Sequence, residues 1–217
     1  MSFVLFDFDG TLADTAPDLA AAANQQRQRR HLPPLPLDAL RPVASQGARG
    51  LLQVALGLTP DHADYEHCKT QFLDDYAASV CVHTRLFPGV PETLNYLALH
   101  QIPWGIVTNK ATRFSTPLFE ALDLLHAHAL VCGDTTPYSK PHPEPLLHAC
   151  RLAEQQPEEG IYIGDDERDI IAGKAAGMLT IAIAYGYCGH DGNPAHWGAD
   201  IVVEQPDALL PALKTLL

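Results

Sequence analysis

The chain opens with the stretch Phe3-Val4-Leu5-Phe6-Asp7-Phe8-Asp9-Gly10-Thr11, in which an apolar run leads into two carboxylates. A continuous apolar run of this kind is typical of a buried strand in a parallel sheet. Open α/β sheets bind their ligands beyond the carboxyl ends of such strands. We therefore expect Asp7 and Asp9 at the rim of a parallel sheet, on a backbone that turns sharply at Gly10.

The spacing of Asp7 and Asp9 points to a cation site. Two carboxylates that lie close together repel each other, so both ionise readily only if a cation lies between them. Mg2+ prefers oxygen ligands, and proteins usually hold it with one or two carboxylates and a substrate phosphate. The same Asp-x-Asp-Gly spacing also fits a calcium loop or an ordinary polar turn, and the spacing alone leaves these alternatives open.

The composition is that of an ordinary globular protein with an acidic excess. The chain has 217 residues, 47% of them hydrophobic, which suits one large domain or one domain with an insertion. A net charge of -12 disfavours nucleic acid and anionic membranes as partners. We see no N-terminal signal and no apolar run long enough to span a membrane. The five cysteines are scattered without a C-x-x-C pair, which favours reduced thiols in a cytoplasmic protein.

Residues 15–81 carry helical patterns and no strand pattern. Good helix formers dominate Leu19 to Arg30, and a cluster of prolines ends that pattern. Ser45 is expected to cap a helix that runs from Gly47 to Leu56. A further helix shows an apolar stripe at steps of three and four residues, formed by Tyr65, Cys68, Phe72 and Tyr76.

From Leu86 onward the pattern alternates between strands and helices. The strands are expected at 104–107, 129–132, 161–163, 180–184 and 201–203. One of the intervening helices is marked by Leu118, Leu122 and Leu125. Such alternation predicts an α/β protein with a Rossmann-like parallel sheet, covered by helices on both faces. The predicted core domain comprises residues 1–14 and 82–217, and the helical insertion at 15–81 forms a cap domain that can act as a lid.

Three later stretches place chemically active residues beside predicted strand ends. Val107-Thr108-Asn109 ends one strand, where a Thr hydroxyl can meet a phosphate oxygen, although Thr-Asn is also common turn chemistry. In Ser139-Lys140-Pro141-His142-Pro143, the prolines fix the backbone and so hold Lys140, whose ammonium can neutralise a carboxylate and a phosphate. Gly164-Asp165-Asp166-Glu167-Arg168-Asp169 follows an apolar strand, although clustered acids often mark only an exposed helix start.

Together these stretches resemble the four signatures of the haloacid dehalogenase (HAD) superfamily of phosphotransferases. The stretch that resembles the first signature is Asp7-Phe8-Asp9-Gly10-Thr11-Leu12-Ala13-Asp14-Thr15. Thr108 matches the second signature, Lys140-Pro141-His142-Pro143 resembles the third, and Gly164-Asp165 with Asp169 matches the fourth. The four occur in the order of the superfamily, and the resemblance covers essentially the full chain. It implies an HAD-like fold with an inserted helical cap.

The resemblance also implies an activity, that of a Mg2+-dependent phosphomonoesterase which works through an aspartyl-phosphate. It implies that Asp7 attacks phosphorus and that Asp9 acts as acid and base. Lys140 is the implied catalytic cation, and Thr108 and Asn109 are implied to bind the substrate. The implied Mg2+ ligands are Asp7, Asp165 and the backbone carbonyl of Asp9, with Asp169 orienting its neighbours.

A basic residue of the predicted cap suggests that the substrate carries a carboxylate. Arg49 lies near a predicted helix N-terminus, a place that binds anions, and its guanidinium can grip a carboxylate; alternatively, it is a surface helix residue. The chain resembles the phosphoglycolate phosphatase group in general. Some stretches look closer to a branch of that group that acts on N-acetylmuramic acid 6-phosphate. These stretches are Arg41–Arg49, Val82–Phe87, Tyr185–Tyr187 and Asn193–Asp200.

We therefore expect a small, carboxylate-bearing phosphorylated metabolite as substrate, and a monomer or homodimer without nucleic-acid or membrane partners. Two alternatives remain from the sequence. One is a sugar phosphomutase of the same superfamily, and the other is a non-catalytic sensor of a phosphorylated ligand. The complete set of signature carboxylates, with Lys140, argues against the sensor.

Overall fold

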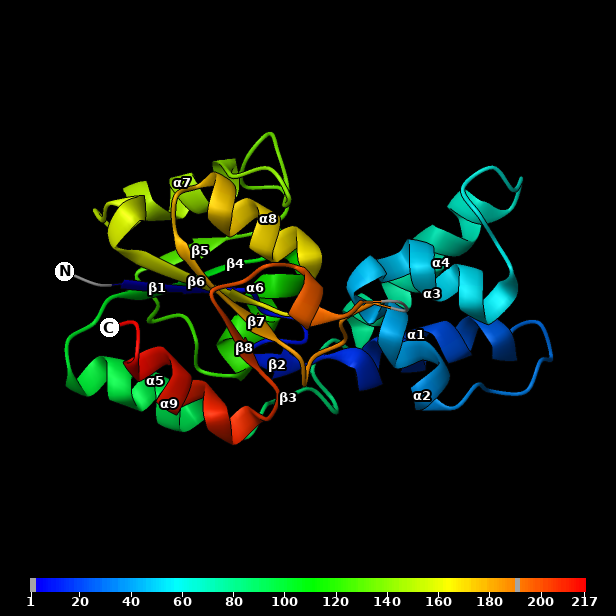
Figure 1. Ribbon diagram of the computed structural model, residues 1–217. Helices are drawn as coiled ribbons and strands as arrows, with labels where there is room; N and C mark the ends of the chain where they lie inside the picture. Colours follow the sequence, from blue (N-terminus) through cyan, green and yellow to red (C-terminus); the bar gives the residue numbers. More distant parts are fainter. Residues whose placement is uncertain (1–2, 190–191) are drawn as a thin grey trace.

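A six-stranded parallel sheet forms the centre of the larger part of the protein in this computed structural model, which describes residues 3–189 and 192–217 (Figure 1). Its strands are, in spatial order, β5 (Ala129–Val131), β4 (Trp104–Val107), β1 (Phe3–Phe6), β6 (Gly160–Gly164), β7 (Leu179–Ile183) and β8 (Ile201–Val203). All neighbouring pairs are parallel. The chain therefore builds outward in one direction from β1 to β5 and in the other from β6 to β8. The direction in which successive strands are added reverses between β1 and β6. Open α/β sheets bind ligands at such a switch point.

Helices cover both faces of the sheet, as the alternating sequence pattern predicts (Figure 1). Val4 and Phe6 belong to the cluster that includes α5 (Val90–Leu99), α6 (Thr112–Ala121) and α9 (Leu209–Lys214). Phe3 and Leu5 point to the opposite face and pack with α7 (Glu144–Leu152) and α8 (Glu167–Ala175). Burial on both faces explains why β1 reads as a continuous apolar run. The predicted α/β fold with a Rossmann-like sheet is confirmed.

The smaller part of the protein is a helical cap at the end of the sheet where β1 finishes (Figure 1). It consists of α1 (Ala16–Gln28), α2 (Leu37–Leu40), the 3-10 helix η1 (Arg41–Gln46), α3 (Gly47–Leu56) and α4 (Tyr65–Ala78). These helices share their own hydrophobic cluster, which includes the predicted stripe of Tyr65, Cys68, Phe72 and Tyr76. The exact division at residues 15–81 stays a prediction, although this cluster and that of the sheet favour it.

Two short strands fasten the cap to the core. β2 (Ala13–Asp14) pairs antiparallel with β3 (Arg85–Leu86), so the chain enters and leaves the cap side by side. The carboxylate of Asp18 also accepts hydrogen bonds from the backbone N–H groups of Val82, His83 and Thr84. Neither feature is apparent in the sequence, because both join residues that are far apart along the chain.

Some strand ends differ from the prediction by one residue, and two further details differ as well. The helix that was expected to include Leu122 and Leu125 ends at Ala121, and Asp123 has a positive φ of 57° that is incompatible with a continuing helix. Ser45 does not cap α3, because it lies inside η1 and Gln46 occupies the N-cap position. The remaining 3-10 helices are η2 (Pro157–Glu159), η3 (Pro194–His196) and η4 (Pro206–Ala208). Within the described residues, no helix is both long and apolar enough to cross a membrane.

Candidate active site

A cavity of about 310 Å³ lies between the carboxyl edge of the sheet and the cap. The core side of its wall includes Asp7, Asp9, Thr108, Asn109, Lys140 and Asp169. The cap side includes Ser45, Gly47, Ala48, Phe72 and Tyr76. Its volume is at the lower end of the range for small-molecule sites. The structure thus brings residues of several predicted signatures together around one space.

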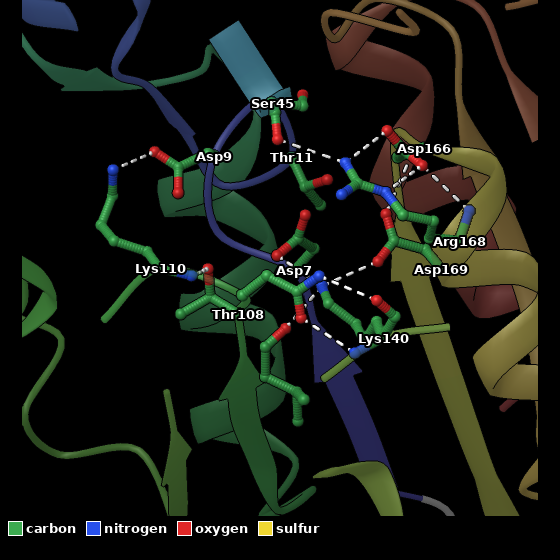
Figure 2. Close-up of polar contacts among 12 residues, drawn as sticks. Asp7, Asp9, Thr11, Ser45, Thr108, Lys110, Lys140, Asp166, Arg168 and Asp169 are labelled. Carbon is green, nitrogen blue, oxygen red and sulfur yellow. Dashed lines mark hydrogen bonds and ion pairs between the residues drawn. The ribbon is translucent and has the colours of Figure 1, made fainter. Parts of the chain in front are cut away.

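Lys140 is the centre of a buried polar cluster (Figure 2). Its Nζ atom lies 2.7 Å from Oδ1 of Asp7 and 2.7 Å from Oδ1 of Asp169. The same ammonium donates to the backbone carbonyl of Val107 at 2.9 Å and to the hydroxyl of Tyr162 at 2.8 Å. Four oxygen partners therefore fix the position of this charge. Tyr162 lies on β6 just before the fourth signature, where it reads as one more apolar residue of a buried strand.

The side chain of Asn109 positions Lys140 from the neighbouring loop. Its amide donates to the backbone carbonyl of Lys140 at 3.0 Å, and its carbonyl oxygen accepts the Lys140 N–H at 2.9 Å. Asn109 also lines the cavity, so contact with substrate remains a proposal beside this observed positioning contact.

Three carboxylates, those of Asp7, Asp165 and Asp169, offer oxygen atoms within 4.8 Å of one another. Burial raises the pKa of Asp7 to about 7, against the opposing influence of Lys140. Burial, followed by the charges of Asp7 and Asp169, raises the pKa of Asp165 well above its ordinary value. Only Lys140 makes an ion pair with this group among the described residues, so three acids face one ammonium. The group therefore has the charge deficit that a divalent cation would correct.

Asp165 is held from two directions. The hydroxyl of Thr11 donates to its Oδ1 at 3.0 Å, and the backbone N–H of Tyr187 donates to its Oδ2 at 2.7 Å. Gly10 has a φ of 83°, and a side chain there would overlap the Asp165 carboxylate. The Asp-x-Asp-Gly turn thus requires glycine for its backbone conformation and for its close approach to the fourth signature.

The side chain of Asp9 points away from the three clustered carboxylates. Its Oδ1 atom lies 2.9 Å from Nζ of Lys110 and also accepts a hydrogen bond from the hydroxyl of Thr15. Lys110 in turn donates to the hydroxyl of Tyr76 on α4 at 3.1 Å, so it joins the core to the cap. The predicted metal contact of Asp9 involves its backbone carbonyl and is not tested by this side-chain placement. Lys110 was missed, although it directly follows Thr108 and Asn109 in the sequence.

Thr108 is buried in the cavity wall at the end of β4. Its hydroxyl oxygen accepts the backbone N–H of Lys110 at 3.1 Å, which leaves the hydroxyl proton to be donated elsewhere. The position suits contact with a phosphate oxygen, as predicted for this residue.

Arg49 and Arg168 differ in their position relative to the cavity. Arg49 is exposed and is not among the residues that line the cavity, so its predicted grip on the substrate finds no support here. Arg168 does line the cavity, and Figure 2 shows its side chain between Asp166 and Ser45. Its Nε and Nη2 atoms each donate to the carboxylate of Asp166 at 2.8 Å, and Nη2 donates to the backbone carbonyl of Ser45 at 3.2 Å. Asp166 and Arg168 lie between Asp165 and Asp169 of the fourth signature, and no separate feature of the sequence pointed to their contacts.

Known proteins share this fold and sequence over nearly the whole chain. The N-acetylmuramic acid 6-phosphate phosphatase of Pseudomonas aeruginosa is 43% identical over 215 residues, which cover 99% of this chain and 95% of that protein. A phosphoglycolate phosphatase of Xanthomonas campestris pv. campestris is 42% identical, with 95% and 93% covered. A crystal structure described as that of a predicted phosphoglycolate phosphatase from Haemophilus somnus matches with a TM-score of 0.84 at 29% identity, covering 97% of each chain.

The family model of the haloacid dehalogenase-like hydrolases matches residues 4–183, which includes the cap and all four predicted signatures. The structural match extends to the cap, because it covers almost the whole chain. The chain therefore belongs to the haloacid dehalogenase-like hydrolase family and is a phosphatase of that family.

Proposed function

We propose that this phosphatase uses Mg2+ to hydrolyse a small phosphate monoester that carries a carboxylate, by way of a transiently phosphorylated Asp7. The observation that carries the proposal is the contact of Asp7 with Lys140 in the wall of the cavity. A phosphate that enters this cavity meets a carboxylate nucleophile, a fixed cation and, at Thr108, a hydroxyl donor.

The clustered carboxylates of Asp7, Asp165 and Asp169 fit a divalent cation. They offer only oxygen ligands and carry more negative charge than Lys140 can balance, which is the chemistry that Mg2+ prefers. We assign the ion to Asp7, Asp165 and the backbone carbonyl of Asp9, with Asp169 orienting these groups. When bound, Mg2+ neutralises charge on the phosphate oxygens and favours the ionised carboxylates.

The first step belongs to Asp7. One of its carboxylate oxygens forms a bond to phosphorus while the bond to the alkoxide leaving group breaks on the opposite side. Lys140 favours the ionised form of Asp7 and offsets the negative charge of the phosphate. The hydroxyl of Thr108 donates to a phosphate oxygen.

The proton transfers belong to Asp9, whose side chain lines the cavity. Asp9 gives a proton to the leaving alkoxide and then takes one from the attacking water. The water oxygen bonds to phosphorus while the bond between phosphorus and Asp7 breaks, which releases inorganic phosphate and the free carboxylate. Lys110 and Thr15 both hold Oδ1 of this carboxylate, and the described residues give Oδ2 no hydrogen-bond partner. Oδ2 is thus the oxygen available to exchange protons.

The substrate class rests on the similar proteins. Both named substrates, N-acetylmuramic acid 6-phosphate and phosphoglycolate, are phosphate monoesters with a carboxylate. The greater identity to the first protein, over a larger part of the chain, favours the sugar phosphate. The five cysteines are free, which agrees with the reducing cytoplasm as the proposed compartment.

Phosphate release provides the test. The purified protein with Mg2+ should release inorganic phosphate from N-acetylmuramic acid 6-phosphate or phosphoglycolate, and Asp7→Asn should abolish this release. Accumulation of an isomerised sugar phosphate would point to a mutase instead. Absence of both reactions, with the protein folded and Mg2+ present, would contradict the proposal.

A further inference from the structure

We propose that Arg168, a residue of the core, supplies the cation that recognises the carboxylate of the substrate. The inference rests on the proposed substrate class and assigns specificity within it. It moves the carboxylate contact from Arg49 on the cap to the first turn of α8, which also carries Asp169.

Three basic side chains line the cavity among the described residues, and two of them are already committed. The ammonium of Lys140 has four oxygen partners, of which two are carboxylates. Lys110 lies between the carboxylate of Asp9 and the hydroxyl of Tyr76, and its side chain is only 9% exposed. Neither is placed to neutralise a second anionic group on the substrate while it keeps these contacts.

Arg168 has donors to spare. Its Nε and Nη2 atoms make the contacts to Asp166 and Ser45, but no described residue accepts a hydrogen bond from Nη1. The side chain is 37% exposed, so a ligand in the cavity can reach it. The two-point contact with Asp166 also fixes the plane of the guanidinium, which therefore needs little reorganisation to bind a carboxylate.

The surroundings of Arg168 on the cap favour an anion as well. The contact with the Ser45 carbonyl places the guanidinium next to the beginning of α3, whose residues Gly47 and Ala48 line the cavity. The N-terminal end of a ten-residue helix carries partial positive charge. The hydroxyl of Ser45 is buried without a hydrogen-bond partner among the described residues, so a polar group beside Arg168 is still unsatisfied.

The other arginines of this region offer no comparable donor. Arg49 is exposed outside the cavity wall. Arg41 holds Asp14 through two contacts, of 2.8 and 2.9 Å, and does not line the cavity either. Arg168, in contrast, lines the cavity and directly precedes Asp169 of the carboxylate cluster in the first turn of α8.

The test compares substrates with and without the carboxylate. We would measure kcat/KM for phosphoglycolate and for its amide, in which a neutral carboxamide replaces the carboxylate, and also for N-acetylmuramic acid 6-phosphate and for N-acetylglucosamine 6-phosphate, which lacks the whole lactyl group. Arg168→Gln should lower the preference for the carboxylate-bearing member at least about tenfold, as expected for the loss of a charge-assisted hydrogen bond. Arg168→Lys should restore part of the preference because it keeps the charge.

Arg151→Gln is the matched control, because it removes a guanidinium from an exposed ion pair with Glu144 outside the cavity wall. Its substrate preference should equal that of the wild type. An unchanged preference in folded Arg168→Gln, or a loss of preference in Arg49→Gln alone, would overturn the inference and leave the proposed function standing. A wild-type protein without any preference for the carboxylate would overturn both the proposed substrate class and the role of Arg168.

Discussion

The ammonium of Lys140 lies 2.7 Å from the carboxylate of Asp7, and both side chains are almost completely excluded from solvent. The two residues reach this contact from different parts of the sequence, because β1 and the loop before α7 end at the same edge of the sheet. A buried charge of this kind depends strongly on its partner. This ion pair therefore contributes both to the stability of the fold and to the proposed chemistry.

Removal of the ammonium should impair both activity and stability. Lys140→Gln should lower kcat about 100-fold or more, since a fixed electrostatic donor is lost from the phosphate site. Without Mg2+, the variant should also melt at a lower temperature than the wild type, because Asp7 and Asp169 lose their shared cation. Steady-state kinetics and thermal melts check the two effects; a fully active variant would show that Lys140 is not part of the site.

Replacement of Asp9 should have an effect that depends on the leaving group. Asp9→Asn cannot protonate an alkoxide, so the rate with an alkyl phosphate should fall by about 10²–10⁴. The loss should be much smaller with p-nitrophenyl phosphate, whose leaving group needs no proton. Comparison of kcat/KM for the two esters provides the measurement. Equal losses on both would contradict the role of Asp9 as the acid that protonates the leaving group.

The raised pKa values predict a link between pH, metal and stability. In the metal-free protein, Asp7 takes up a proton at a pKa of about 7, whereas its ordinary value is 3.8. The folded state therefore binds more protons than the unfolded state between these values, and this group lowers stability as pH rises from about 4 to 7. Asp165 acts in the same direction.

Mg2+ should relieve that destabilisation, since it takes the place of the protons. We expect Mg2+ to raise the melting temperature more at about pH 7.5 than at about pH 5.5. The difference should shrink in Asp165→Asn, which removes one of the acids. Melting curves with Mg2+ and with a chelator give the comparison, and an equal effect of Mg2+ at both pH values would contradict the assigned ligands.

Tyr187 should contribute to the attachment of the cap. Its buried hydroxyl oxygen accepts the backbone N–H groups of Thr15 at 2.7 Å and Ala16 at 2.8 Å, at the beginning of α1. Tyr187→Phe leaves these donors without their acceptor, at a cost of about 2 kcal/mol. Chemical denaturation measures the change. Tyr185→Phe, which loses only a 3.3 Å contact to the Thr11 carbonyl, serves as the control and should cost less.

Much of the fold could be predicted because the pattern of apolar residues along a strand or helix reflects which of its faces are buried. The apolar run at 3–6 is buried on both faces, and the stripe of Tyr65, Cys68, Phe72 and Tyr76 packs into the cap. The prediction that a helix reaches Leu125 was wrong at the C-terminal end of that helix. The leucines have the spacing of a helical stripe, but the backbone turns at Asp123. Apolar periodicity does not reveal such a turn.

The site could be predicted only where a residue type and its neighbours carry a signature. Asp7 and Lys140 lie in contact as expected, since each belongs to a short stretch that resembles a signature of the superfamily. The contacts of Lys110 with Asp9 and Tyr76, and of Arg168 with Ser45, join distant segments and leave no local trace. Arg49 was chosen from its place near a helix N-terminus, but the direction of a side chain on a helix depends on the packing of that helix.

The stereochemical course at phosphorus tests the central claim most directly. Attack by Asp7 followed by attack of water involves two in-line displacements, each of which inverts the phosphorus centre. A phosphorothioate analogue of the substrate, made chiral at phosphorus with 17O and 18O and hydrolysed in ordinary water, should therefore give chiral inorganic thiophosphate with overall retention of configuration. Inversion would mean that water attacks the substrate directly, and would contradict a phosphorylated Asp7.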